Sequence, residues 1–404
     1  MQTIHVCLIS ESILPNLIPA FMDENIAGII SFSGDGKQKK KRQLLTQLLE
    51  ERNIPLLKSM NANNSFDLPT LIQCANELKD WLEKNASDKT WKINVTGGTK
   101  PMALAIYSVF QAHTNSEVIY QDTQSLTLRN LTAPAKDQPN YSVINYDTYL
   151  AAQRFNITQQ AIYDQDDLDH LMARKWIIDQ VLMPNMWQIY HFTSFFNRPA
   201  ASVKSKNGHV NLTQPFPQKF KFHDALEEML ADMQPANLFT LDRDKRTITF
   251  YDEEAAAFLG GGWLEEYAYW CALEAGIEYV GLNVYGEWDM QATNKPASNE
   301  FDLVCCHNNQ LLVVECKALA FNDEVKGQDI VNKIEALKSK AGGVYGKSLL
   351  VACDKLQAEN KHTQHIVQRL NDYKIDLKQR KELKHLTKYF EDWRTKCDRH
   401  LKTA

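Results

Sequence analysis

An apolar run in the C-terminal third of the chain ends in two charged residues, and this combination constrains the fold more than any other feature. The run is Leu311–Lys317, with Glu315 and Lys317 at its end, and Asn299–Asp302 precedes it across a short polar segment. The two segments predict the strands of a β-hairpin, in which alternation puts Glu315 and Lys317 on one face. Charged groups at the end of a buried strand are costly without partners. A divalent metal held by Asp302 and Glu315, with Lys317 near the attacking water, would supply those partners.

This set of residue types suits the hydrolysis of a phosphodiester. At neutral pH that reaction needs positive charge on the phosphoryl oxygens and an activated water, and Mg²⁺ or Mn²⁺ held by carboxylates supplies both. Asp302 and Glu315 are the expected ligands, and the backbone carbonyl of Cys316 is the expected third. Lys317 can orient the water, help to remove its proton and stabilise developing negative charge.

An acid on a helix often completes such a site, and the predicted helix Trp263–Ala275 offers two candidates. Glu265 and Glu266 are adjacent, so only one of them can face inward. We expect Glu265 to be the catalytic residue, although the apolar periodicity of the helix leaves the choice open.

A second motif lies in the N-terminal third, where the strand Trp91–Val95, a Gly-Gly turn and a helix start follow one another. Glycines let backbone approach a ligand closely, and helix N-terminal amides favour phosphate. The first strand also ends in a loop with hydroxyl groups, and parallel strands place such ends at one rim of the sheet. The simpler alternative is that the serines and threonines only cap helices. The candidate ligand-binding residues are Ser10, Ser12, Thr96, Gly97, Gly98, Thr99 and Lys100.

The pattern of apolar segments divides the chain into three parts. Residues 1–138 alternate strands with amphipathic helices, which predicts an α/β domain with a mostly parallel, doubly wound sheet. Residues 139–250 are less regular and are expected to form a linker or a small middle module. Residues 251–404 hold the Glu-bearing helix and the hairpin, and are expected to form the third unit.

Composition excludes several classes of protein. The 404 residues carry a net charge of −5, so any contact with nucleic acid must come from local basic patches. Eight cysteines without a CxxC pair exclude zinc fingers and disulfide frameworks, and favour reduced thiols in the cytoplasm. The N-terminus lacks the features of a signal peptide and no apolar run reaches 18 residues, so we expect no membrane span.

Two resemblances emerge from these motifs. The order of a helix with Glu265, a strand with Asp302 and a strand ending in Glu315-x-Lys317 resembles the PD-(D/E)xK nuclease superfamily, with Phe301 in the place of the motif's proline. The strand–TGGTK–helix motif in a Rossmann-like domain resembles the CARF (CRISPR-associated Rossmann fold) ligand sensors. Together they resemble the CARF–nuclease effectors of type III CRISPR defence, with the DUF1887-type architecture. The resemblance spans both ends of the chain and is weakest over residues 140–250.

This resemblance implies a homodimer whose paired CARF domains bind a cyclic oligoadenylate, most often cyclic tetra-adenylate, across the two-fold axis. Binding would switch on the metal-dependent cleavage of DNA or RNA. Thr96–Lys100 match the ligand motif of the family, and Ser10 and Ser12 match its first-strand loop less specifically. A cyclic ligand with repeated phosphates suits a two-fold site to which each subunit brings the same amides and one lysine. The residues that match the nuclease core are Asp302, Glu315 and Lys317.

Two other functions stay open from the sequence. The chain could be a ligand-sensing regulator in which the middle module binds DNA and the nuclease fold is inactive. The complete set of Asp302, Glu315 and Lys317 argues against that function, because an inactive relic is expected to lose at least one member. It could also be a DNA-repair or restriction nuclease whose N-terminal domain binds a nucleotide or a partner protein.

Overall fold

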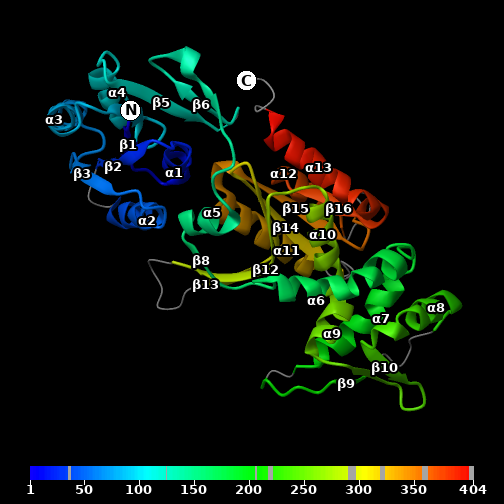
Figure 1. Cartoon of the computed structure of the whole chain (residues 1–404). Helices are drawn as coiled ribbons and strands as arrows, with labels where there is room; N and C mark the ends of the chain where they lie inside the picture. Colours follow the sequence, from blue (N-terminus) through cyan, green and yellow to red (C-terminus); the bar gives the residue numbers. More distant parts are fainter. Residues whose placement is uncertain are drawn as a thin grey trace.

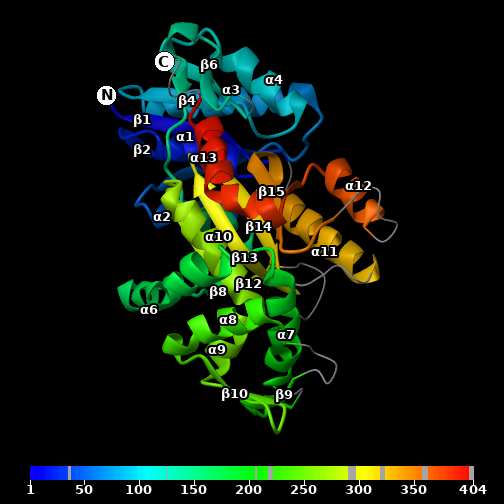
Figure 2. The same ribbon diagram turned by 90° about the vertical axis from the view of Figure 1, so that its right-hand side faces the viewer.

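Three parts follow one another along the molecule, as Figures 1 and 2 show: the N-terminal domain at one end, the C-terminal domain in the centre and a largely helical module at the other end. The structure is a computed structural model. It describes residues 1–34, 38–123, 125–204, 207–216, 222–289, 297–318, 324–356 and 363–399.

A seven-stranded sheet in the order β3-β2-β1-β4-β5-β6-β7 forms the N-terminal domain. Strands β1 to β5 pair in parallel, whereas β6 and β7 are antiparallel. Helices α1 and α2 pack on one face of the sheet, and α3 and α4 pack on the other. The predicted doubly wound α/β domain is therefore confirmed. Its elements are β1 (Thr3–Leu8), α1 (Leu14–Phe21), β2 (Ile26–Ser33), α2 (Lys39–Glu50), β3 (Leu56–Asn61), α3 (Leu68–Asn85), β4 (Thr90–Asn94), α4 (Lys100–Phe110), β5 (Ser116–Asp122), β6 (Thr127–Asn130), η2 (Pro134–Lys136) and β7 (Gln138–Pro139).

A six-stranded sheet in the order β16-β15-β14-β13-β12-β8 forms the C-terminal domain. The predicted hairpin is its centre, since β13 and β14 pair antiparallel, and β14, β15 and β16 pair in parallel. Helices α10 and α13 share a core with one face of the sheet, whereas α11 and α12 share another core with strand β15. Its elements are α10 (Trp263–Glu274), β12 (Tyr279–Trp288), β13 (Ala297–His307), β14 (Gln310–Lys317), α11 (Glu324–Leu337), η6 (Lys338–Gly342), η7 (Gly343–Tyr345), β15 (Gly346–Ala352), α12 (Gln364–Asp372), β16 (Asp376–Gln379), η8 (Arg380–His385) and α13 (Leu386–Cys397).

The segment expected as one middle module is divided between two parts of the fold. Strand β8 (Phe155–Gln159) is the edge of the C-terminal sheet, paired antiparallel with β12, and Phe155 packs 5.0 Å from Trp288 and 5.1 Å from Phe301 between ring centroids. Helix α5 packs in the core that the hairpin shares with α1 and α2, and the rest of the segment forms the helical module, whose small sheet has the order β10-β11-β9. The remaining elements are α5 (Tyr146–Ala152), α6 (Gln165–Trp176), η3 (Ile177–Leu182), α7 (Ile189–Ser202), β9 (Thr213–Pro215), α8 (Asp224–Asp232), η4 (Gln234–Ala236), β10 (Phe239–Asp242), β11 (Thr247–Phe250), α9 (Glu253–Ala257) and η5 (Phe258–Gly262).

The N-terminal and C-terminal domains are packed together. One hydrophobic core contains residues of α1 and α2, of α5 and β8, and of the hairpin β13–β14. The turn of that hairpin is bonded to the segment that links the domains, because Asn309 Oδ1 accepts from the N–H of Val143 at 2.9 Å and its Nδ2 donates to the carbonyl of Tyr141 at 2.7 Å. Tyr141 in turn donates its hydroxyl to the carbonyl of Met22, directly after α1, at 2.6 Å. The turn of the β13–β14 hairpin is thus tied to the first helix of the N-terminal domain.

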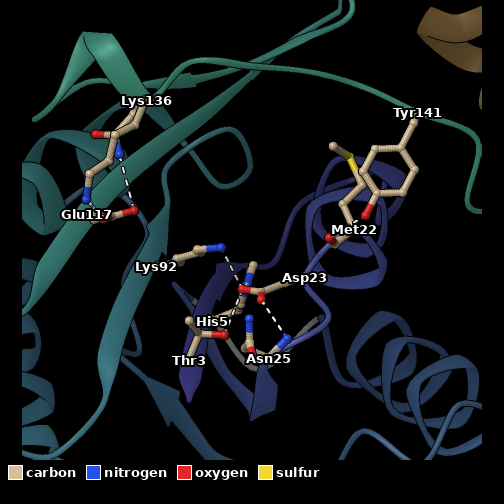
Figure 3. Close-up of polar contacts among 10 residues, drawn as sticks. Thr3, His5, Met22, Asp23, Asn25, Lys92, Glu117, Lys136 and Tyr141 are labelled. Atoms are coloured by element: carbon tan, nitrogen blue, oxygen red, sulfur yellow. Dashed lines mark hydrogen bonds and ion pairs between the residues drawn. The ribbon is translucent and has the colours of Figure 1, made fainter. Parts of the chain in front are cut away.

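A buried ion cluster lies toward the amino ends of β1 and β4 (Figure 3). Asp23 Oδ2 accepts from Thr3 Oγ1 at 2.7 Å and lies 2.8 Å from His5 Nε2 and 2.7 Å from Lys92 Nζ. Burial lowers the pKa of the fully buried His5, since it disfavours the imidazolium. Burial alone would raise the pKa of Asp23, but hydrogen bonds from His5, Lys92 and Thr3 outweigh it and hold that pKa well below its ordinary value.

Replacing Asp23 with alanine is expected to lower the free energy of unfolding by roughly 3 kcal/mol, because Lys92 then loses its partner in a largely buried position. In the native protein both groups bind fewer protons when folded than when unfolded. The free energy of unfolding therefore decreases as the pH is lowered below 6.5, the pKa of His5 in the unfolded chain. It decreases further as the pH is lowered below 3.8, the corresponding pKa of Asp23. Urea denaturation of wild type and Asp23→Ala between pH 7 and pH 3 measures both the loss of stability and its pH dependence. Equal stability of Asp23→Ala and wild type over that range would contradict the prediction.

No helix in the described ranges is long and apolar enough to cross a membrane.

Candidate active site and ligand rim

Two buried carboxylates lie where the hairpin opens. The antiparallel ladder between β13 and β14 ends at the pair Leu303 and Val314, so Asp302 and Glu315 come directly after its last pair. Asp302 is 3% exposed and Glu315 is 1% exposed. The N–H of Cys316 donates to Asp302 Oδ2 at 2.7 Å. Because the N–H and C=O of one strand residue face the same edge, the carbonyl of Cys316 also faces Asp302.

Lys317 lies against both carboxylates, as the alternation of β14 predicts. Its Nζ is 2.7 Å from Glu315 Oε1 and 3.5 Å from Asp302 Oδ2. Burial by itself would lower the pKa of Lys317, but the two carboxylates outweigh it and raise that pKa above the ordinary value. Burial and the neighbouring Asp302 raise the pKa of Glu315. In this arrangement Lys317 is an ammonium group, which suits orientation of water and charge stabilisation better than proton removal.

The structure adds a second lysine that the sequence did not single out. Lys333 on α11 has its Nζ 2.8 Å from both oxygens of Glu315 and 3.8 Å from Asp302 Oδ1. It comes 16 residues after Lys317 and from a helix rather than a strand. Nothing in a single sequence tells which of several helical lysines faces the site, because that depends on how α11 packs on the sheet.

Of the two adjacent acids on α10, Glu265 faces the candidate site. Glu266 is paired elsewhere, with its Oε2 2.9 Å from Arg174 Nε. Burial, together with Asp302 and Glu300, raises the pKa of Glu265 to about 8. This arrangement agrees with the expectation of Glu265 rather than Glu266.

Asn283 joins Glu265 to the hairpin. It lies opposite Asp302 in the register of β12, has a φ of 49° and leaves a gap in the ladder. Asparagine tolerates this left-handed conformation better than most residues. With its amide nitrogen turned toward them, it donates to the carbonyl of Asp302 at 3.2 Å and to Glu265 Oε2 at 3.0 Å. Sequence reasoning missed this residue, since a lone asparagine in a strand carries no signal.

The donor set fits a hard divalent cation. In the described parts of the chain, no three His, Cys, Asp or Glu side chains come together closely enough to hold a metal by themselves. A zinc site needs at least three protein ligands, whereas Mg²⁺ usually takes one or two carboxylates and completes its shell with water and substrate. Asp302, Glu315 and the carbonyl of Cys316 match the second type of site. Among the described residues, the ammonium groups of Lys317 and Lys333 balance the two carboxylates.

Cavities next to these residues leave room for a substrate. One of about 390 Å³ lies between the helical module and the site. Two more, of about 520 and 510 Å³, border each other at Tyr285 and Glu300. The first cavity is lined by Glu265, Cys316 and Lys317 and by Asn197, Ala200 and Lys204.

The TGGTK turn lies beside the end of β1, at the point where the strand order reverses between β1 and β4. Open α/β sheets bind ligands at such a point. A Cβ added at Gly97 would lie 2.1 Å from the carbonyl oxygen of Leu8 and 3.2 Å from Ser10 Oγ. Gly98 has a φ of 75°. Glycine is therefore required for the close approach of the two loops, and Ser10 is brought next to the turn.

The side chains of the two threonines in the motif make hydrogen bonds within the chain. Thr96 Oγ1 donates to Asn94 Oδ1 at 2.6 Å and accepts from the N–H of Gln121 at 2.7 Å. Thr99 Oγ1 donates to the carbonyl of Ser65 at 2.7 Å and accepts from the first turn of α4. The capping alternative therefore holds for Thr99, and both side chains shape the rim.

Lys100 is the first residue of α4 and is exposed. Among the described residues, no hydrogen bond or ion pair joins its side chain to another. Ser12 contributes its carbonyl, which accepts from Ser10 Oγ at 3.0 Å. The helix itself offers few donors, because Pro101 has no N–H and the N–H of Met102 already donates to Thr99 Oγ1. Of the groups that the structure describes at this rim, Lys100 and the amides of the glycine turn are those that suit phosphate.

Two family models match the chain. Residues 4–149 match the Card1 CARF domain, and residues 252–397 match the Card1-like endonuclease domain. The resemblance at both ends of the sequence is therefore confirmed, and so are the CARF and endonuclease folds.

Solved structures match over nearly the whole chain. The protein VC1899 from Vibrio cholerae aligns with a TM-score of 0.81 and 22% identity, over 98% of each chain. Can2 from Sulfobacillus thermosulfidooxidans, solved in complex with cyclic tetra-adenylate, aligns with a TM-score of 0.69 and 21% identity, over 96% of each chain. A search of curated proteins found no match.

Proposed function

We propose that this chain, which joins a Card1 CARF domain to a Card1-like endonuclease domain, is a metal-dependent nuclease activated by a cyclic oligoadenylate. The first candidate activator is cyclic tetra-adenylate, and the setting is antiviral defence of the type III CRISPR kind. The substrate is DNA, RNA or both. The observation that carries the proposal is the buried pair Asp302 and Glu315, paired with Lys317 and Lys333, next to Glu265 and a cavity.

Each residue of the site has a role in this proposal. Asp302, Glu315 and the carbonyl of Cys316 hold Mg²⁺ or Mn²⁺, which supplies charge neutralisation at the phosphate and a water of lowered pKa. Lys317 orients that water and stabilises the charge that develops on the phosphoryl oxygens. Glu265, held by Asn283, completes the acidic side of the site and would accept hydrogen bonds from water there.

The ligand site is proposed at the rim of the CARF sheet. The amides of Gly97 and Gly98 and the backbone N–H and ammonium of Lys100 contact phosphates, and the loop of Ser10 and Ser12 closes the site. Thr96 and Thr99 hold the turn in shape rather than contact the ligand through their hydroxyls. A second copy of the chain supplies the other half of the site, because a cyclic ligand with repeated phosphates fits a two-fold axis. A similar solved structure supports this ligand, because Can2 was solved in complex with cyclic tetra-adenylate.

The contacts between domains offer a route from ligand to nuclease. Helix α1 follows the Ser10–Ser12 loop and ends at Phe21, directly before Met22, whose carbonyl accepts from the hydroxyl of Tyr141. Tyr141 is bonded to Asn309 in the turn of the hairpin that carries Asp302 and Glu315. A shift of α1 on ligand binding therefore moves the base of the hairpin, and a rotation of the two subunits about the dimer axis can add to it.

The cysteines support a reducing compartment, for which we propose the cytoplasm. All eight are free and buried. No disulfide is needed to hold the fold, whose cores are large and apolar.

The test is cleavage of labelled single-stranded DNA, single-stranded RNA and supercoiled plasmid, with Mn²⁺ or Mg²⁺, and with and without cyclic tetra-adenylate. Cleavage that requires both metal and ligand is the expected result. Cleavage that ignores the ligand would leave the nuclease and remove the sensor. Binding of duplex DNA without cleavage under any of these conditions would favour a ligand-sensing regulator instead.

A further inference from the structure

Lys333 is the feature of the site that the proposed chemistry has not used. It reaches the two carboxylates from α11, while Lys317 reaches them from β14. Glu315 is almost fully buried, so this is not an exposed ion pair of the kind that contributes little. The Lys333 side chain is itself 32% exposed, and it also lines the cavity of about 510 Å³ with Ser298, Asn299 and Glu300. In the ion pair between Glu315 and Lys333, the carboxylate is buried and the lysine borders the cavity in which a substrate can lie.

The charges at the pair are already balanced. Asp302 and Glu315 bring two negative charges, and Lys317 and Lys333 bring two positive ones. A divalent cation between the carboxylates would add two more positive charges within a few ångströms of both ammonium groups. Repulsion between cations at that distance is strong where water is largely excluded. One of the lysines must then leave Glu315.

Lys333 is the lysine placed to leave. Lys317 belongs to the same strand as Glu315, two residues away, and its backbone is fixed in the sheet by the N–H of Cys353 donating to its carbonyl at 3.0 Å. Lys333 sits on a separate helix, and its long stem can turn toward the cavity without any change in the sheet. A free ammonium there faces the position of a nucleic-acid backbone.

We propose that Lys333 is a substrate-binding residue that exchanges partners. Without metal it neutralises Glu315 and Asp302, and with metal bound it moves to a non-bridging phosphate oxygen of the nucleic acid in the adjoining cavity. The inference rests on the proposed nuclease function and names a residue for it outside the predicted motif. It also explains why two acids can stay buried side by side in the absence of metal.

The test is to compare wild type with Lys333→Ala, Lys333→Arg and Lys340→Ala. Lys340 lies seven residues on, is exposed and stacks over Trp288 at 5.5 Å, so its loss removes the same charge without touching the carboxylates. Mn²⁺ binding to the full-length protein without nucleic acid is measured by calorimetry or electron paramagnetic resonance. Lys333→Ala is expected to bind Mn²⁺ roughly three- to tenfold more tightly, because a competing cation is gone. Lys340→Ala is expected to bind it as wild type does.

Cleavage kinetics supply the second readout. Lys333→Ala is expected to raise KM for nucleic acid about tenfold or more through the loss of a phosphate contact. Lys333→Arg keeps the positive charge, so its KM is expected to stay close to that of wild type. Lys333→Met keeps the apolar stem and replaces the alanine variant if thermal melting shows that the latter is unfolded. If Lys333→Ala, or Lys333→Met in its place, binds Mn²⁺ as wild type does or more weakly, the proposed exchange of partners by Lys333 is wrong. An unchanged KM would overturn it as well. A wild type that binds Mn²⁺ but cleaves nothing would instead count against the proposed function.

Discussion

Replacing Lys317 with alanine is expected to lower the rate of ligand-activated cleavage by roughly 10²- to 10³-fold, the cost of removing one group that stabilises transition-state charge. Its ammonium is 2.7 Å from Glu315 and 3.5 Å from Asp302, the two side chains proposed to hold the metal. Affinity for cyclic tetra-adenylate is expected to be unchanged, because the ligand rim lies in the other domain. Single-turnover cleavage assays and calorimetric ligand titration measure the two effects.

The matched control is Lys347→Ala, which removes an exposed lysine from β15, the strand next to β14. It is expected to cleave like wild type. Glu315→Ala is expected to lose cleavage as completely as Lys317→Ala does, since it removes a proposed metal ligand. Cleavage by Lys317→Ala at the wild-type rate would show that the active site lies elsewhere, whatever the ligand does.

The residues that the sequence predicted are those whose surroundings are local. The alternation of Leu311–Lys317 is sufficient to put Glu315 and Lys317 on one face, and the ladder of β13 and β14 brings Asp302 beside them. The glycines of the TGGTK turn are equally local, because a strand end and a helix start determine their conformation. For these positions, period and spacing carry the information.

The features that the sequence did not predict depend on distant segments. Strand β8 is five residues long and largely polar, and only its pairing with β12 reveals that it belongs to the C-terminal sheet. Lys333 and Asn283 reach the site through the packing of α11 and through a left-handed residue in β12. The motif alone predicts the hydroxyls of Thr96 and Thr99 as ligand contacts. It does not predict the hydrogen bonds that they make within the chain, to Gln121 and Ser65, which lie about 25 and 34 residues away.

Replacing Gly97 with valine is expected to weaken binding of cyclic tetra-adenylate at least 100-fold, a loss of about 2.7 kcal/mol. A Cβ at this position would lie 2.1 Å from the carbonyl of Leu8, so the turn must move away from the end of β1. That movement takes the amides of α4 and the side chain of Lys100 with it, since Lys100 comes three residues later. Calorimetric titration of the full-length protein measures the change in affinity.

Two companion variants separate the loss of the site from the loss of the fold. Gly342→Ala is the matched glycine control, because a Cβ there meets no atom within 4 Å, and it is expected to bind the ligand as wild type does. Lys100→Ala removes only the exposed charge and is expected to weaken binding about tenfold, as the loss of one charge-assisted phosphate contact does. Gly97→Val with wild-type affinity would remove the TGGTK turn from the ligand site. If Gly97→Val and Lys100→Ala both bind the ligand weakly and melt at the wild-type temperature, the ligand binds at the rim between β1 and β4 and acts on the nuclease from there.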